Sequence, residues 1–110
     1  MAKFEIFTSK NGSFYFRLRA SNGEPILASE GYKAKSSAKN GIESVRKNAK
    51  KDDRFQRKTS SRGQAYFVLI AGNNEPIGKS EMYSSASAME NGIASVKKNA
   101  PSAPVEDLTK

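Results

Sequence analysis

The chain has 110 residues, of which 36% are hydrophobic, and it carries a formal net charge of +8. It contains no cysteine and no histidine, which excludes disulfides, zinc–thiolate sites and the commonest general base and metal ligand. The length suits one domain or two very small ones. Residues 1–7 lack the apolar run of a signal peptide, and no stretch approaches the roughly 20 apolar residues of a membrane span. We therefore expect a cytoplasmic protein without membrane contact.

The sequence repeats itself at an offset of 51 residues. Residues 4–49 align without a gap on residues 55–100, and more than half of the aligned positions carry the same residue. A repeat of this strength means that each unit forms the same supersecondary structure. We predict a single pseudo-symmetric domain over residues 1–110, with repeat one at 3–51 and repeat two at 54–102.

Each unit begins with a pattern typical of strands. Asn-Gly pairs at 11–12 and 22–23 predict tight turns, because both residue types tolerate positive φ. Apolar residues alternate with polar ones on either side of the first turn, and Pro25 is acceptable at the start of a strand. The strands predicted for the first unit are residues 4–8, 14–20 and 25–30.

The period becomes helical from Ser36 onward. Four apolar residues form one stripe of the predicted helix: Ala38, Ile42, Val45 and Ala49. Gly41 lies beside this stripe, where a missing side chain permits close approach of helix and sheet. Asn48 is expected to end the helix in the left-handed conformation.

The second unit adds its own signals for the ends of its helix. Ser87 and Glu90 have the spacing of a capping box, and Pro101 is expected to stop the helix. Residues 105–109 repeat the first strand a third time. We predict that the strand after each helix completes the sheet of the preceding unit, so that residues 105–109 close the sheet of the second unit.

Several motifs and their second-copy partners resemble the YegP-like family of small bacterial proteins of unknown function. They are the 11–12 turn, Tyr15-Phe16, Asn22-Gly23-Glu24, residues 29–32 and residues 40–45. The resemblance covers nearly the whole chain. It implies an α+β fold of two tandem β-β-β-α-β units that share one largely antiparallel sheet and exchange their terminal strands. It implies no catalytic or binding residues, and the sequence departs from the pattern at Arg57 and Lys58.

The recurring polar residues give no signature of an enzyme. Glu30 and Glu81 recur at equivalent places, which does not bring two carboxylates together, so a structural role is favoured over acid–base catalysis. Asn40 and Asn91 lie within the predicted helices, where asparagine is a poor helix former. A hydrogen bond that fixes the helix is favoured there over a ligand contact. With no phosphate-binding loop and no serine beside a base, we predict no catalytic residue, metal site or cofactor.

Charge differs between the two halves. Residues 1–62 hold 15 of the 19 lysines and arginines and carry a net +9, whereas residues 63–110 carry a net −1. Alternation places three residues of the second strand opposite the core side, and two lysines follow the third strand. The predicted anion-binding residues are Tyr15, Arg17, Arg19, Lys33 and Lys35. The equivalent positions in the second unit predict a protein-interaction surface made of Tyr66, Val68 and Ile70.

These surfaces favour a non-enzymatic binding module for an anionic partner, which could be a nucleic acid or an acidic protein. The alternative is a structural or homo-oligomeric protein that forms a homodimer through its sheet face. A solvated sheet face without a ligand is the competing interpretation of the basic strip. We also expect both helices to cover one face of a single sheet.

Overall fold

The structure is a computed structural model that describes residues 2–109. Its elements are β1 (Lys3–Thr8), β2 (Phe14–Arg19), β3 (Pro25–Ala28), α1 (Lys35–Asn48), a 3₁₀ turn (Asp52–Arg54), β4 (Phe55–Thr59), β5 (Ala65–Ile70), β6 (Pro76–Lys79), α2 (Ala86–Asn99) and β7 (Val105–Asp107). Neither helix in this part of the chain is both long and apolar enough to cross a membrane.

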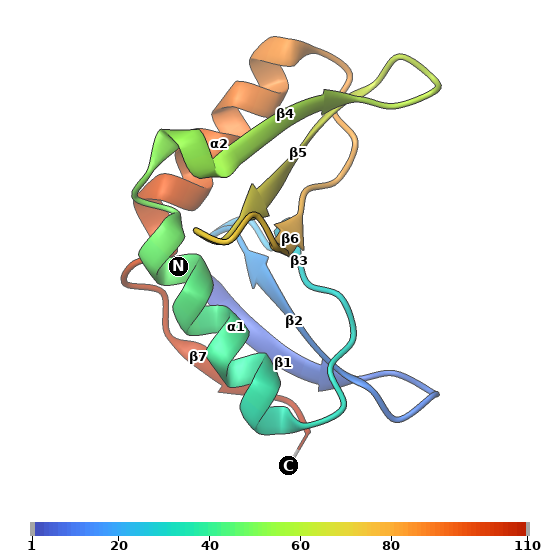
Figure 1. Cartoon of the computed structure of the whole chain (residues 1–110), viewed down its shortest axis with the longest axis vertical. Helices are drawn as coiled ribbons and strands as arrows, with labels where there is room; N and C mark the ends of the chain where they lie inside the picture. Colours follow the sequence, from blue (N-terminus) through green and yellow to red (C-terminus); the bar gives the residue numbers. More distant parts are fainter. Residues whose placement is uncertain (1, 110) are drawn as a thin grey trace.

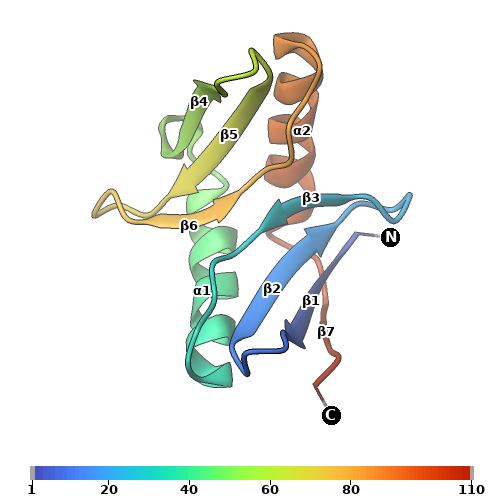
Figure 2. The same cartoon turned by 90° about the vertical axis from the view of Figure 1, so that its right-hand side faces the viewer.

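The strands form one seven-stranded sheet in the order β4-β5-β6-β3-β2-β1-β7. All neighbouring strands are antiparallel except β1 and β7, which run parallel. The two halves meet where β3 pairs with β6 through Ala28 and Lys79. Figure 2 shows the result, a three-stranded ribbon from each unit with the two ribbons joined at β3 and β6 and the helices behind.

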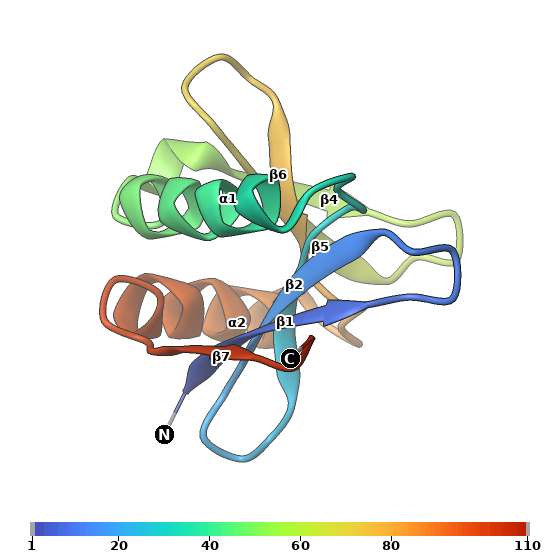
Figure 3. The same cartoon turned by 90° about the horizontal axis from the view of Figure 1, so that it is seen from below.

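Both helices lie on one face of the sheet, as expected (Figures 1 and 3). The alternation of the strands produces this arrangement, because residues such as Phe4, Phe16 and Leu18 are fully buried on the side that faces the helices. α1 contacts strands of both halves, and α2 packs on β5 and on β3 of the other half. Each helix therefore ties its own unit to the other.

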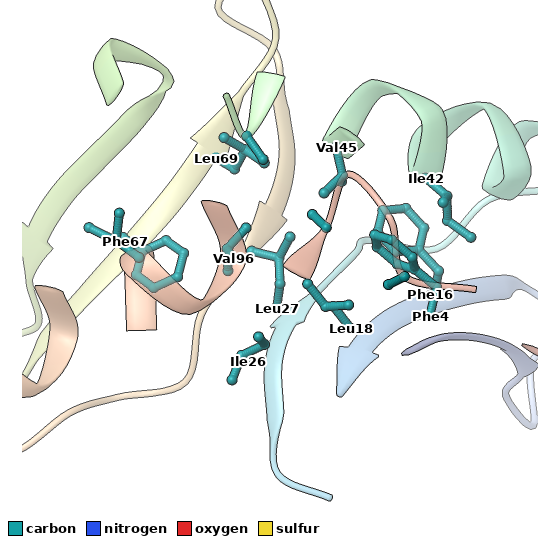
Figure 4. Packing of buried hydrophobic residues seen from close by; sticks show 14 of the residues in the cluster. Phe4, Phe16, Leu18, Ile26, Leu27, Ile42, Val45, Phe67, Leu69 and Val96 are labelled. Atoms are coloured by element: carbon teal, nitrogen blue, oxygen red, sulfur yellow. The ribbon is translucent and has the colours of Figure 1, made fainter. Parts of the chain in front are cut away.

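The core is continuous across the two halves, and Leu27 lies near its centre (Figure 4). The helix stripe predicted from the sequence is buried. Gly41 permits the expected close approach of helix and sheet, since an added Cβ there would lie 2.6 Å from Tyr32 Oη and 2.7 Å from Phe16 Cε2. A side chain at this position would push α1 away from the sheet.

The predicted place of the last strand was wrong. β7 does not close the second unit but lies beside β1 at the other end of the sheet, with Val105 opposite Phe4. The terminal strands are exchanged, but in the opposite sense to the prediction. β4 follows α1 and pairs with β5 of the second half, and β7 follows α2 and pairs with β1 of the first half. The chain leaving α2 is guided there by Arg46 of α1, whose Nη2 donates to the carbonyl oxygen of Ala103 at 2.9 Å.

Three smaller predictions also differ from the structure. Asn48 stays helical, because its side chain donates to the carbonyl oxygen of Ser44 at 2.8 Å, and Ala49 continues in the right-handed region. Ser87 does not cap α2: the cap is Ser85, which accepts from the amide of Ala88. The third strand ends at Ala28 instead of residue 30.

Candidate functional site on the outer face of the sheet

The sheet face opposite the helices carries a continuous row of side chains. Direct register pairs run across all seven strands in this row: Gln56, Val68, Lys79, Ala28, Arg17, Glu5 and Glu106. Figure 2 looks onto this face. Ala28, at the middle of the row, has a small side chain between the longer Lys79 and Arg17.

In the first half of this face, an acidic side chain holds the two predicted arginines. Glu5 Oε1 accepts from Arg17 Nε at 2.7 Å and from Arg19 Nε at 2.6 Å. The Glu5 side chain is only 8% exposed. Burial alone would raise the pKa of Glu5, but the hydrogen bonds from Arg19 and Arg17 outweigh it and lower the pKa below its ordinary value. The basic strip is thus partly neutralised by an acid that the sequence interpretation did not include.

Aromatic stacking occupies the neighbouring part of the same half. The rings of Phe7 and Tyr15 stack with centroids 5.7 Å apart, and the guanidinium of Arg17 lies 4.3 Å from the centre of the Phe7 ring. One face of Tyr15 is therefore covered by Phe7. Tyr15 was predicted as part of an anion-binding strip, and in the structure one face of its ring is already occupied by Phe7.

The structure does not bring the five predicted anion-binding residues together. Tyr15, Arg17 and Arg19 share the outer face of β2, whereas Lys35 begins α1 and pairs with Asp107 of β7 at 2.9 Å. Hydrogen bonds from Thr109 and Lys35 lower the pKa of Asp107. Lys33 lies exposed in the segment before the helix.

The second half of the outer face is hollowed into a groove of about 510 Å³. Its walls come from β4, β5 and β6 and from the end of β3, and they include Lys58, Tyr66, Val68 and Lys79. Lys79 Nζ lies 5.1 Å from the centre of the Tyr66 ring. The groove thus combines an apolar surface with two ammonium groups.

The repeat gives a reason for the groove in the second half. Lys58 and Val68 occupy the positions held by Phe7 and Arg17 in the first unit. There the phenyl ring and the guanidinium pack on each other and cover the sheet. A lysine and a smaller valine leave the same region open.

The predicted protein-interaction residues are only partly available. Tyr66 and Val68 are half-buried and line the groove. Ile70 is 7% exposed, so it offers almost no surface to another chain. The groove also contains Gln56, Lys58 and Lys79, which the sequence interpretation did not single out although alternation places them on the outer face.

The repeated polar residues lie outside this arrangement or at its edge. Asn40 and Asn91 are exposed, and within residues 2–109 their side chains make no hydrogen bond, so the predicted fixing contact is absent there. Glu30 lines the groove. Burial, and then the charge of Glu30, raises the pKa of Tyr32, and Glu81 acts likewise on Tyr83.

Architecture and surface together define a class of small proteins built from two β-β-β-α units on one sheet. The sequence profile of DUF1508, a domain of unknown function, matches residues 9–56 and 60–107, and the chain belongs to this family. It is 50% identical over 105 residues to the "UPF0339 protein in ptx operon 5'region" of Stutzerimonas stutzeri, covering 96% of this chain and 95% of that protein. It is 49% identical over 106 residues to the UPF0339 protein YegP of Escherichia coli (strain K12), covering 96% of each.

Solved structures show the same fold. The solution NMR structure of E. coli yegP, a protein of unknown function, superposes with a TM-score of 0.93 at 48% identity, covering 98% of this chain and 93% of that one. The NMR structure of UPF0339 protein SO3888 from Shewanella oneidensis gives a TM-score of 0.93 at 44% identity, covering 98% and 92%. The predicted family and the α+β fold are thereby confirmed.

Proposed function

We propose that the protein is a non-enzymatic binding module whose groove takes an acidic segment of a partner protein. The observation that carries this proposal is the pairing of Lys58 and Lys79 with the apolar surface of Tyr66 and Val68. Within residues 2–109 neither lysine forms an ion pair, so neither charge is neutralised by a carboxylate of the chain. Cations beside an apolar surface suit a ligand that carries both carboxylates and apolar groups.

An acidic protein segment is favoured over a nucleic acid by the state of the aromatic rings. Proteins that bind single strands stack the bases on open aromatic faces. Here Tyr15 is covered on one face by Phe7, and Lys79 lies over the ring of Tyr66. Basic residues remain for phosphate contacts, but the stacking surfaces are partly taken.

The absence of catalytic activity remains part of the proposal and is supported by the groove itself. Glu30 is the one carboxylate among the groove residues that the structure describes. A homodimer through the same face has less support, because Ile70 is buried and the apolar surface left by Tyr66 and Val68 is small.

The test is a titration of labelled ligands into the native protein and two charge-matched double variants. The ligands are a peptide that alternates glutamate with valine and a single-stranded RNA, each at two salt concentrations. Lys58→Ala/Lys79→Ala should bind the peptide at least about tenfold more weakly than the native protein. The control Lys50→Ala/Lys98→Ala removes the same charge from exposed sites away from the groove and should change the affinity much less.

Two outcomes would contradict the proposal. Equal losses of peptide affinity in the two double variants would show that binding depends on the net charge of the protein and not on the groove. Tighter binding of the RNA than of the peptide, lost in Lys58→Ala/Lys79→Ala, would assign the groove to nucleic acid instead.

A further inference from the structure

The two equivalent strands β1 and β4 differ at their outer edges. By the repeat, Phe55–Thr59 corresponds to residues 4–8 of β1. The edge of β1 is covered by β7, whereas β4 is the last strand at the other end of the sheet. An edge strand presents unpaired backbone groups that can pair with another extended chain. The pairing of β7 with β1 therefore shows how a further strand could pair with the outer edge of β4.

The covered edge shows how a strand is held in this position. The amide of Phe4 donates to the carbonyl oxygen of Pro104 at 2.8 Å, and the amide of Leu108 donates to the carbonyl oxygen of Ile6 at 2.8 Å. A charged contact on the outer face adds to this, because Lys3 Nζ lies 2.7 Å from Glu106 Oε1. The strand added here is acidic and runs parallel to β1.

Two of the three equivalent backbone positions are open on β4, because both backbone groups of Phe55 already have partners within the chain. Alternate residues of a strand direct their backbone groups to opposite edges, so Phe55, Arg57 and Thr59 face outward as Phe4 and Ile6 do. The 3₁₀ turn uses the amide of Phe55, which donates to the carbonyl oxygen of Asp52. The amide groups of Arg57 and Thr59 are left facing the free edge.

Charge on β4 favours an acidic occupant. Arg54 stands at the position equivalent to Lys3, and Lys58 lies four residues further along the same outer face. Neither forms an ion pair within residues 2–109, and Arg54 Nε is buried without a hydrogen-bond partner. Between them Gln56 replaces the acidic Glu5 of β1. A carboxylate placed opposite Gln56, as Glu106 is placed opposite Glu5, would face no acidic residue on β4 itself and would lie beside Lys58.

We propose that the free edge of β4 takes an extended acidic segment of a partner protein as an added parallel strand, as β1 takes β7. This is strand addition, in which backbone bonds give affinity and side chains on alternate positions give specificity. The site is the edge of β4 rather than the groove, so it goes beyond the function proposed above. A second copy of the chain is disfavoured, since antiparallel pairing of two β4 strands would bring Arg57 and Lys58 of both copies together.

The probe is a synthetic peptide with the sequence of residues 103–109 and blocked termini, added to the intact ¹⁵N-labelled protein. Amide shift changes should centre on Arg57 and Thr59. A control peptide in which the two acids carry Glu106→Lys and Asp107→Lys should bind at least about tenfold more weakly. Changes centred on Phe4 and Ile6 would mean that the peptide displaces β7, and a self-association of the protein that buries β4 would assign the edge to a second copy. Either result would overturn the proposal.

Paired variants isolate the backbone donor. Arg57→Pro and Arg57→Ala both lose the ion pair with Glu90, but only proline removes the outward amide. The proline variant should bind the acidic peptide at least about tenfold more weakly than the alanine variant. If Arg57→Pro fails to fold, Thr59→Pro against Thr59→Ala gives the same comparison at the next outward position.

A groove variant separates this site from the groove. In Lys79→Ala the amide shift of Thr59, which reports on the edge of β4, should give a peptide affinity within about twofold of the native value, because Lys79 lies in the groove and on β6. Equal binding by the proline and alanine variants, or a loss in Lys79→Ala as large as that in Arg57→Pro, would overturn the edge assignment. The groove proposal would stand in either case, because its own test uses Lys58 and Lys79 together.

Discussion

The Cγ atom of Leu27 lies 2.7 Å from the point where a Cβ atom on Gly78 would stand. These residues are equivalent in the repeat, and they lie in β3 and β6, the two strands that join the halves. Leu27 is 1% exposed and fills the centre of the core (Figure 4). Where the two units meet, the side chain of Leu27 fills the space that a side chain at position 78 would need. The repeat therefore carries leucine in one copy and glycine in the other.

The substitution Gly78→Ala should therefore destabilise the protein by about 1–3 kcal/mol, the range for overpacking a filled core. The φ angle of Gly78 lies outside the left-handed region, so alanine would otherwise be neutral or slightly stabilising at this position. The sign of the change thus reports on the contact with Leu27. Urea unfolding of the native protein and of the variant measures it.

The control is the same substitution in a Leu27→Ala background. Leu27→Ala alone should cost about 2–5 kcal/mol, and adding Gly78→Ala should then cost little or restore stability, because the space is free. Additive losses in the double variant would show that the two residues do not share this space.

The repeat and its alternation were sufficient to predict most of the secondary structure and the face covered by the helices. They did not predict the place of β7. The 51-residue repeat shows which segments have similar sequences, but it does not determine which strands are neighbours in the sheet. The helix ends at Asn48 as predicted, but the left-handed conformation expected there was wrong, because the side chain of Asn48 bonds to Ser44 within the helix. Ser85 was missed as the cap although it precedes the helix, because Ser87 and Glu90 matched a familiar spacing.

The site was predictable in part. Arg17 and Arg19 were placed on the correct face by alternation, and the same rule applied to β1 would have placed Glu5 beside them. The groove was not predictable, since its opening depends on Lys58 and Val68 being unable to cover the sheet as their first-unit equivalents do. That difference needs the positions of side chains in three dimensions.

Ile42 and Ile93 provide a matched pair of core substitutions. Both are 1% exposed and lie at equivalent positions of α1 and α2. Replacing either with alanine should lower the free energy of unfolding by about 2–5 kcal/mol, because a cavity is left between helix and sheet. Chemical denaturation of both variants is the measurement. A loss below about 0.5 kcal/mol for either one would place that residue at the surface.

The first unit should not fold on its own. A fragment of residues 1–60 lacks β7, which covers the edge of β1, and lacks β6, which pairs with β3. It also exposes Leu27, and a chain of this length buries too little surface to compensate. The expected result is a fragment without a cooperative thermal transition as a monomer. Cooperative unfolding of a monomeric fragment, shown by calorimetry together with sedimentation, would contradict the shared-sheet architecture.

Glu5 should make stability depend on pH in the acidic range. Because the folded pKa of Glu5 is lowered from the ordinary 4.5, the unfolded chain binds a proton that the folded chain does not. The stability contributed by Glu5 is present above pH 4.5 and is lost as the pH falls toward the folded pKa. Glu5→Gln should lower the free energy of unfolding at pH 7 by about 1–3 kcal/mol, since Arg17 and Arg19 lose a charged acceptor. The same variant should show a shallower decline in stability below pH 4.5 than the native protein.

The control is Glu24→Gln, at an exposed turn, whose stability should follow the native curve. Parallel stability curves for Glu5→Gln and the native protein would exclude Glu5 as the titrating group.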